Sequence, residues 1–460
     1  MERIFKSIVN LNNSNRWDYH FHQQQFTDLE ASLAASPFPL HTVEQLTEQV
    51  IDGTHYTPEY TDSSGILFLM ARNVRPFEIN LDTVSYITQA EHQKLLRCKP
   101  QSGDVLVTKD GTIGVAAVVP DSLPEFNIFV SVIKIRPREI ISPHYLTAFL
   151  NSELGQMQIR QQVKGASITH IHLEDMRRLK IPLPPRDIQD RIAQLMQDAY
   201  AARQAKLAEA QRLLGGIDDN VLEGLNVDVS LINFEKKFTV QSSELNSKWR
   251  VENHDIRGIE TALLNGHFPV NQVNTFSVFV TDKIRPDTDF KYIEIGSINT
   301  LTGEIITSEL LTCNGITAPN NAQRQIREGD ILISTRRPTR GAISVVPSSL
   351  DGEICTLFFS IIRINADIEL LAEYVAAFLR TDVGRLQIQR AITATTYPVI
   401  SDADVSRFLV PVPPIEIQQA IIDDISERKK TFQKLQIEAQ QIIDAAKAKV
   451  ERLILDGETI

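Results

Sequence analysis

The chain contains an internal duplication. The segment IPLPPRDIQ at residues 181–189 recurs as VPVPPIEIQ at residues 410–418, so that Pro182 of the first copy corresponds to Pro411 of the second. The same offset relates Tyr145 to Tyr374 and extends to several of their neighbours. A register kept over this length is the signature of a repeated structural unit. We therefore predict two copies of one scaffold within the 460 residues.

Similarity between the halves continues upstream of these segments. At the offset of the proline segments, Phe129 matches Phe358 and Ser131 matches Ser360. The segment SGDVLVT at residues 102–108 corresponds to EGDILIS at residues 328–334. The offset between these two segments is slightly shorter, which indicates a small insertion or deletion between the matches. Before this point the similarity fades, so the halves are expected to share a scaffold and to differ in their opening segments.

Each half has the pattern of a mixed α/β domain. Apolar, β-branched runs at residues 104–108 and 115–119 flank the segment KDGTIG at residues 109–114, which predicts a strand, a turn and a second strand. A further strand is predicted over residues 129–135. A helix is predicted over residues 143–150, because a proline stands at its favoured first position.

A long helix is predicted after each proline pair. Proline suits the first turn of a helix and not its interior, and after Pro185 and Pro414 apolar residues recur every three or four positions. The uninterrupted lengths of about 29 and about 42 residues correspond to roughly 44 and 63 Å. The apolar positions of the second helix are Ile421, Ile425, Phe432, Leu435, Ala439, Ile442, Ala446 and Leu453. Each stripe can be buried against the other helix, although periodicity leaves their relative direction open.

Composition limits the class of protein. Hydrophobic residues make up 42% and charged residues 23%, as in ordinary globular proteins. There is no apolar run of the ~18 residues that a membrane span needs and no secretory signal, so a cytoplasmic protein is expected. The 3 cysteines lack CxxC spacing, which argues against a disulfide framework or a cysteine-rich zinc site. The net charge of −11 disfavours a uniformly basic surface for nucleic acid but leaves local basic loops open.

Sequence signatures of catalysis are absent. The chain has no GxxxxGKS phosphate loop, no glycine-rich nucleotide fingerprint, no Asn-Pro-Pro-aromatic tetrapeptide, and no HExxH or GxSxG motif. We therefore expect no catalytic activity and no cofactor. The pairs His170/His172 and His20/His22 have a spacing that a metal ion can use, but no third ligand accompanies them, so packed or exposed histidines are favoured over a metal site.

Three features together resemble the specificity (S) subunits of type I restriction-modification systems. They are the twice-used proline segment before a long helix, the stretch GDVLVTKDGTIG at residues 103–114, and DGTHYTP at residues 52–58. The resemblance covers essentially the whole chain. It implies two target recognition domains that each read one part of a split DNA sequence. It also implies an antiparallel helical spacer that docks methyltransferase subunits, with a restriction subunit as a further partner.

The resemblance implies a fold class and domain boundaries. We expect an α/β (mixed α+β) chain in which two repeated globular target recognition domains are joined and separated by two long antiparallel coiled-coil helices. The domains are expected at residues 1–184 and 234–413, and the helices at residues 185–233 and 414–460. The second half departs from the pattern, because RRPTRG at residues 336–341 replaces the glycine turn of the first half and the GTHxTP segment has no clear counterpart.

Candidate DNA contacts in the first half lie in three segments. Glycine turns expose backbone amides to phosphate, and hydroxyl, imidazole and aromatic groups suit groove or backbone contacts. The candidates are Gly53, Thr54, His55, Tyr56 and Thr57; Lys109, Asp110, Gly111 and Thr112; and Lys164, Ser167 and Thr169. The alternative for each segment is an ordinary turn with no ligand.

The second half offers a denser cationic loop. Arginine can read guanine with two hydrogen bonds or hold phosphate. The candidates are Arg336, Arg337, Thr339 and Arg340, and, at the place that matches residues 164–169, Thr395, Thr396 and Tyr397. A solvated loop is the alternative.

The leading hypothesis is a non-catalytic DNA-recognition subunit for a bipartite, asymmetric site. Because phosphate neutralisation supplies much of the affinity for DNA, a chain of net charge −11 is expected to bind DNA weakly without its partners. The alternatives are a coiled-coil protein-interaction scaffold, the specificity subunit of a modification-only defence system, and an enzyme with an unrecognised catalytic cluster.

Overall fold

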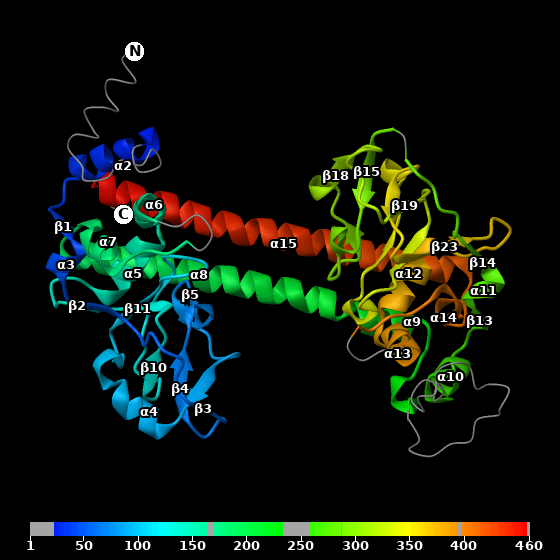
Figure 1. The fold of residues 1–460 in the computed structure, drawn as a ribbon, viewed down its shortest axis with the longest axis horizontal. Coiled ribbons are helices and arrows are strands. Elements are labelled where there is room, and N and C mark those ends of the chain that lie inside the picture. The colour runs from blue at the N-terminus through cyan, green and yellow to red at the C-terminus, as the bar shows by residue number, and fades with distance from the viewer. Residues whose placement is uncertain (1–22, 164–168, 233–256, 287, 393–396, 458–460) are drawn as a thin grey trace, which may run out of the picture. The chain divides into compact units, whose positions relative to one another are not determined.

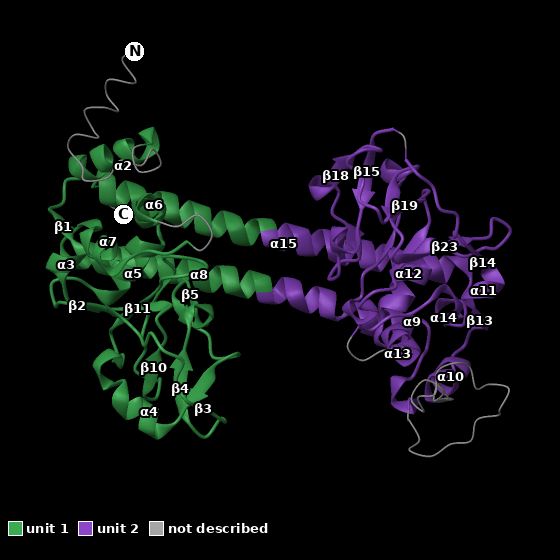
Figure 2. Ribbon diagram, in the orientation of Figure 1, with its two compact units in different colours: residues 1–207, 437–460 green, residues 208–436 purple. Residues whose placement is uncertain are grey.

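The computed structural model describes residues 23–163, 169–232, 257–286, 288–392 and 397–457. The chain divides into two compact units (Figure 2), unit 1 with residues 1–207 and 437–460 and unit 2 with residues 208–436. His20 and His22 lie outside the described residues. None of the helices in the described ranges combines the length and the hydrophobicity that crossing a membrane requires.

A four-stranded antiparallel sheet forms the centre of unit 1 (Figure 1). Its order is β2 (Thr47–Asp52), β11 (Val132–Pro137), β8 (Val105–Thr108) and β9 (Ala116–Val118). The helices of this unit that precede the long one are α2 (Gln24–Ala35), α3 (Val43–Leu46), α4 (Gln89–Lys94), α5 (Pro143–Asn151), α6 (Glu153–Gln162) and α7 (Leu173–Arg178). The strand, turn and strand predicted over residues 104–119 and the helix predicted over residues 143–150 are confirmed.

A second sheet of unit 1 builds a separate lobe. Its order is β10 (Phe126–Ile128), β4 (Ile66–Leu69), β7 (Ser85–Ile87) and β3 (Tyr60–Thr61). The smaller pairs are β1 (Leu40–Thr42) with β12 (Lys180–Pro182) and β5 (Val74–Arg75) with β6 (Glu78–Ile79). Phe68 packs with Leu95 and Cys98, which follow α4, and Ile128 packs with Leu106 and Val132 of the central sheet, so the lobe shares a core with that sheet.

Unit 2 repeats this plan. Its central sheet has the order β14 (Ser277–Phe279), β23 (Phe359–Ile364), β20 (Ile331–Ser334) and β21 (Ile343–Val345). Its second sheet has the order β18 (Leu311–Cys313), β15 (Phe290–Ile293), β22 (Ile354–Thr356) and β19 (Ala322–Gln325). Strand β13 (Val270–Gln272) pairs with β24 (Leu409–Pro411), and β16 (Ile298–Asn299) with β17 (Glu304–Ile305). The helices are α9 (Ile217–Gly224), α10 (Arg257–Leu264), α11 (Val273–Phe276), α12 (Ala372–Arg380), α13 (Asp382–Ala391) and α14 (Asp402–Val405).

The strand register corrects one part of the repeat. Val132 pairs with Thr108, and Phe359 pairs with Ser334 in the equivalent place. Val132 therefore corresponds to Phe359, an offset shorter than that of the proline segments, so the matches predicted for Phe129 and Ser131 are wrong. The strand predicted from residue 129 begins at Val132. The difference in offset arises after the strand, because Pro143 at the start of α5 corresponds to Ala372 at the start of α12, as the proline segments require.

The duplicated proline segment attaches each long helix to its own sheet domain. The buried side chain of Gln189 accepts a hydrogen bond from the Ser142 amide at 2.7 Å and donates to the carbonyl of Pro184 at 2.9 Å. Gln418 makes the equivalent bonds with the Leu371 amide at 2.9 Å and the carbonyl of Pro413 at 2.8 Å. The glutamine that ends the repeated motif is thus a structural residue.

Two further buried contacts recur in both units. The Tyr145 hydroxyl donates to the carbonyl of Pro182 at 2.5 Å, and the Tyr374 hydroxyl donates to that of Pro411 at 2.8 Å. In each central sheet, an arginine donates two hydrogen bonds to a buried aspartate, which directly precedes β8 in unit 1 and β20 in unit 2. These pairs are Arg136 with Asp104 and Arg363 with Asp330, at 2.7 to 2.9 Å.

The long helices are α8 (Arg186–Gly215) and α15 (Ile415–Leu455). In unit 1, Ile192 and Met196 of α8 share a core with Ile443 and Val450 of α15. In unit 2, Ala210 and Leu214 share a core with Phe432 and Leu435, and the amide of Asn220 donates to Asp424 at 3.2 Å. Later residues of one helix meet earlier residues of the other, so the helices are antiparallel and the expected fold class is confirmed.

The predicted seam of α15 needs a small correction. Ile443 is buried in place of the predicted Ile442, and Val450, which was not among the predicted positions, is buried as well. From Ala439 to Leu453 the buried residues therefore follow steps of four, three, four and three. This is the spacing of a helix that packs along one partner.

Candidate nucleic-acid interface

The turn after β8 places a lysine against a carboxylate from β2. The Lys109 Nζ donates to Oδ2 of Asp52 at 2.6 Å, and the side chains are 13% and 8% exposed. A ring nitrogen of His55 lies 3.2 Å from the other oxygen of Asp52. Burial raises the pKa of Asp52, but the hydrogen bonds from Lys109 and His55 outweigh it, so the pKa lies below its ordinary value. The charge of Lys109 is consequently neutralised within the chain.

The GTH segment divides into buried and exposed residues. Gly53 and Thr54 are buried, and a Cβ added to Gly53 would lie 1.9 Å from the carbonyl oxygen of Ile128. Only glycine permits this close approach of two backbones. His55, Tyr56 and Thr57 are exposed, and the Tyr56 hydroxyl donates to a carboxylate oxygen of Glu91 at 3.0 Å. The first two residues shape the segment, and the next three present side chains to solvent.

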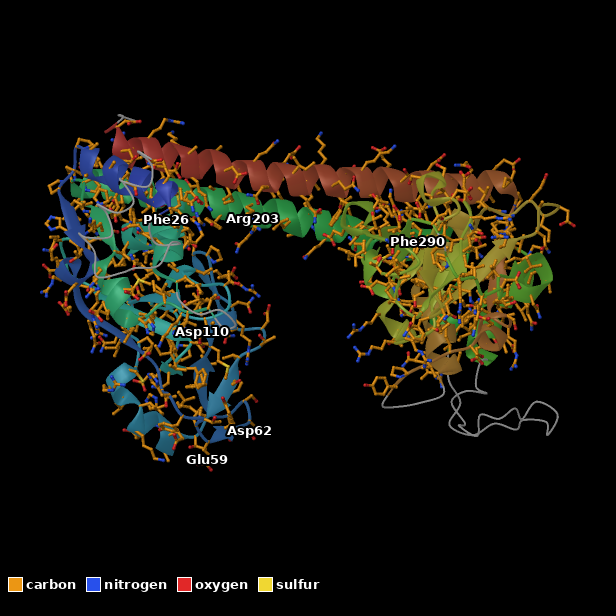
Figure 3. The ribbon with its side chains drawn as sticks, turned by 45° about the horizontal axis from the view of Figure 1, so that its top comes forward. Phe26, Glu59, Asp62, Asp110, Arg203 and Phe290 are labelled. Carbon is orange, nitrogen blue, oxygen red and sulfur yellow. The ribbon has the colours of Figure 1, made fainter. Side chains whose placement is uncertain are left out.

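The turn at residues 109–112 lies beside a second candidate segment. Asp110 forms a backbone bridge with His170, and the amide of Ile171 donates to the carbonyl of Lys109 at 3.3 Å. This places the exposed Thr169 next to the turn, whose tip carries the exposed Gly111 and Thr112. Figure 3 shows Asp110 on this turn, with Glu59 and Asp62 further from the long helices. Lys164 and Ser167 lie outside the described residues.

An open cleft of about 610 Å³ lies at the base of this turn. Asp52, His55 and Lys109 line one part of it, and His172, Glu174 and Arg177 from the region of α7 line another. Arg177 is anchored, because its guanidinium donates to the carbonyl of Val50 at 2.6 Å. Within the described ranges, no three His, Cys, Asp or Glu side chains are grouped so that they could hold a metal ion.

In unit 2 the segment 336–341, which we call the arginine loop, replaces the turn. Arg336, Arg337, Thr339 and Arg340 are all exposed. The guanidinium carbon of Arg336 lies 5.2 Å from the centre of the Phe358 ring, a cation–π contact. None of the three arginines forms an ion pair with a residue that the structure describes.

An exposed aromatic residue lies beside the arginine loop. The backbone of Arg336 bridges to Val399, and the amide of Arg337 donates to the carbonyl of Pro398 at 2.9 Å. Tyr397, with 68% of its surface exposed, therefore lies next to the loop. Thr395 and Thr396 lie outside the described residues. As in unit 1, two candidate segments that are far apart in the sequence are brought together.

The arginine loop has an unusual backbone. Arg337 has φ 48° and ψ 49°, in the left-handed region, and a short 3₁₀ turn at Pro338–Arg340 ends at Gly341 with φ 75°. Gly111 and Gly114 in unit 1 have φ of 70° and 83°. The two loops thus use similar left-handed positions with different residues.

Sequence reasoning missed the residues that support these loops. Asp52 belongs to the DGTHYTP segment, but its pairing with Lys109 joins residues 57 positions apart, and only their opposite charges signalled it. Phe358 lies under Arg336, and because its match with Phe129 was a chance identity, nothing in the sequence signalled this contact. Glu91, which orients Tyr56, had no signal in the sequence.

Comparison with known proteins gives the family directly. The family model for the type I restriction modification DNA specificity domain matches residues 79–212 and 268–444, which is more than half of the chain. The matches fall on both halves of the repeat.

Two curated relatives and one solved structure are similar to the chain. The chain is 21% identical over 451 residues to a putative type I restriction enzyme MjaX specificity subunit from Methanocaldococcus jannaschii, covering 95% of this chain and 97% of the relative. It is 25% identical over 193 residues to the type I restriction enzyme EcoBI specificity subunit from Escherichia coli, covering 42% and 38%. A crystal structure of the S subunit of a type I restriction-modification system from M. genitalium matches with a TM-score of 0.44 and 12% identity, covering 91% and 96%.

Proposed function

The chain belongs to the type I restriction-modification DNA specificity family, as the non-catalytic subunit that recognises DNA, and from this premise we propose that it reads a bipartite, asymmetric site through two chemically different loop surfaces. The loops of unit 1 read one part of the site, and the arginine loop with Tyr397 reads the other. The proposed readers correspond to target recognition domains at residues 1–184 and 234–413, with the helical spacer at residues 185–233 and 414–460.

The arginine loop is the observation that carries this proposal. It places three exposed arginines that lack ion-pair partners among the described residues in a chain of net charge −11. Unpaired arginines repel one another and gain from an anionic partner. Guanidinium groups fit both phosphate and the major-groove edge of guanine.

Unit 1 has a different surface chemistry. Its lysine is paired with Asp52, and the exposed side chains around it are mainly hydroxyl-bearing or aromatic: His55, Tyr56, Thr57, Thr112 and Thr169. Hydroxyl and aromatic side chains contact bases and sugars without a large gain from phosphate charge. A protein with two such readers recognises two different half-sites, so its site lacks two-fold symmetry.

The long helices are proposed to set the distance between the half-sites. The 30 residues of α8 correspond to about 45 Å and the 41 residues of α15 to about 62 Å. These lengths are of the order of one turn of B-DNA, roughly 34–36 Å. Each helix contributes residues to both compact units, which supports a role as the spacer.

The same helices are proposed to dock the methyltransferase subunits, with a restriction subunit as a further partner in the cytoplasm. The acidic balance of the chain supports a need for partners, because affinity for DNA depends on neutralised phosphates. Basic surfaces on the docked subunits then supply much of the sequence-independent affinity.

Lengthening the spacer tests the proposal. Seven residues are inserted into both helices, after Leu207 in α8 and after Gln436 in α15, where the compact units meet along the sequence. Seven helical residues add about 10 Å, or roughly three base pairs. Sequencing of methylated adenines in cells that carry the variant and its methyltransferase should show both half-sites unchanged and the gap between them about three base pairs longer.

An insertion in α15 alone serves as the control. It shifts the apolar residues of α15 on one side of the insertion out of register with their partners on α8 and should abolish methylation. An unchanged gap in the double insertion would show that the helices do not set the spacing. Absence of any base preference in the unmodified complex would instead favour a protein-interaction scaffold.

A further inference from the structure

Arg337 occupies a backbone position that unit 1 gives to glycine. Because Ser334 and Thr108 occupy equivalent places in the sheets, Arg337 and Gly111 both stand three residues after the end of their strands. Both have left-handed backbones, with φ of 48° and 70°. L-amino acids other than glycine adopt this conformation at an energetic cost, which asparagine and aspartate tolerate best.

Packing does not explain an arginine at this position. A Cβ added to Gly111 would meet no heavy atom within 4 Å, so the equivalent space in unit 1 is open and glycine is needed there for its backbone alone. Arg337 is exposed, and its guanidinium has no hydrogen bond or ion pair with a described residue. A left-handed backbone position that carries an exposed arginine without a side-chain partner points to a partner outside the chain.

The backbone of Arg337 is fixed on both sides. Its amide donates to the carbonyl of Pro398 at 2.9 Å, and its carbonyl accepts from the amide of Arg340 at 3.0 Å. These bonds hold the direction in which the side chain leaves the loop. Arg336 differs, because its guanidinium already lies over the Phe358 ring.

We infer that Arg337 determines specificity in unit 2 by reading a guanine with two hydrogen bonds. The inference rests on the proposed function, in which the arginine loop faces DNA. A fixed backbone below a planar two-donor group suits the O6 and N7 acceptors of guanine in the major groove. Such an arrangement loses less freedom on binding than a mobile arginine does.

The test compares three substitutions in the complex of the full chain with its methyltransferase. R337G and R337N remove the guanidinium but keep residues that suit the left-handed backbone, so both variants should fold. R337K keeps the charge but lacks the two-donor fork. Binding to oligonucleotides randomised over the recognised site measures base preference, and thermal unfolding of the free chain measures stability.

All three variants should lose preference at one guanine of one half-site, by about 5- to 150-fold. The other half-site should be read as before. R337G should unfold at the same temperature as the unmodified chain or at a higher one, because glycine relieves the backbone strain. The matched control R327Q, at an exposed arginine that precedes β20 and lies outside the arginine loop, should keep the preference at that guanine.

Two results would overturn the inference. The first is a uniform loss of binding in R337G that R337K restores, because this describes a phosphate contact. The second is unchanged affinity and preference in R337G and R337N. Neither is confused with failure of the proposed function, which would appear in the unmodified complex as an absence of base preference in both half-sites.

Discussion

The side-chain oxygen of Gln189 accepts a hydrogen bond from the backbone amide of Ser142 at 2.7 Å, 47 residues away in the chain. The contact joins the first turns of α8 to the start of α5, and Gln418 repeats it in unit 2 with the amide of Leu371. The conspicuous repeat in the sequence therefore marks the junction of each long helix with its sheet domain.

Substitution of this glutamine should destabilise unit 1. Gln189→Leu leaves the buried Ser142 amide and the Pro184 carbonyl without partners, so the free energy of unfolding should fall by about 2 kcal/mol. Urea unfolding followed by circular dichroism measures the change. Gln194→Leu on the same helix removes only an exposed bond to Asp198 and should cost less than about 0.5 kcal/mol. Equal losses in the two variants would contradict a structural role for Gln189.

The buried arginine–aspartate pairs should be the most sensitive ionic contacts. Arg363→Met removes the two hydrogen bonds that the guanidinium gives to the fully buried carboxylate of Asp330 and leaves, among the described residues, only the one from the Arg327 amide, which should cost about 3 kcal/mol. Urea unfolding midpoints again measure the loss. Glu174→Gln removes the exposed pair with Arg178 and should cost less than about 0.5 kcal/mol. A negligible effect of Arg363→Met would mean that Asp330 finds another partner.

Stability should decline in alkali because of two tyrosines. Burial raises the pKa of both Tyr145 and Tyr374, so above pH of about 10 the unfolded chain releases protons that the folded chain retains. Their contribution is complete below that pH and is lost as the pH rises further. Urea midpoints between pH 8 and 11 should fall less steeply in the Y145F/Y374F double variant, although it starts from a lower value because two carbonyls lose their donor. The exposed Tyr60→Phe change should leave the slope unaltered.

The two loops should differ in their response to salt. If Arg340 holds a phosphate, Arg340→Gln should reduce the slope of log affinity against log salt concentration by about 1. Lys109→Gln should leave the slope unchanged, because the ammonium is already paired with Asp52. Titrations of the methyltransferase complex at several salt concentrations compare the variants, and the isolated chain should bind DNA much more weakly than the complex. Equal reductions in the two slopes would contradict the proposed difference between the units.

Most of the architecture was predictable because short-range sequence patterns determine it. Proline pairs and three- to four-residue apolar spacing mark α8 and α15 to within a few residues. The prediction placed Ile442 in the seam instead of Ile443 because both residues are apolar. Only packing against α8 determines which of the two neighbours is buried. The predicted alignment of β11 with β23 was wrong, because the sequence does not show on which side of a strand an insertion lies. The chance identity of Phe129 with Phe358 favoured the wrong side.

The interface was less predictable, because its contacts join distant parts of the chain. The arginine loop was visible as a charge cluster, but its neighbour Tyr397 comes into place only through the bridge between Arg336 and Val399. The sequence suggested that the charge of Lys109 was available to DNA, but the structure pairs it with Asp52. The close approach of Gly53 to Ile128 likewise gives a structural reason for a residue that suggested a ligand contact.

The paired glutamine, tyrosine and arginine–aspartate contacts all close within one unit and leave residues 109–112 and 336–341 outside their networks. Substitutions at the exposed positions of either loop, such as Thr112 and Arg340, leave these three sets of contacts intact. A lineage carrying this duplicated frame can therefore change its target one half at a time, while the unaltered half keeps its own preference.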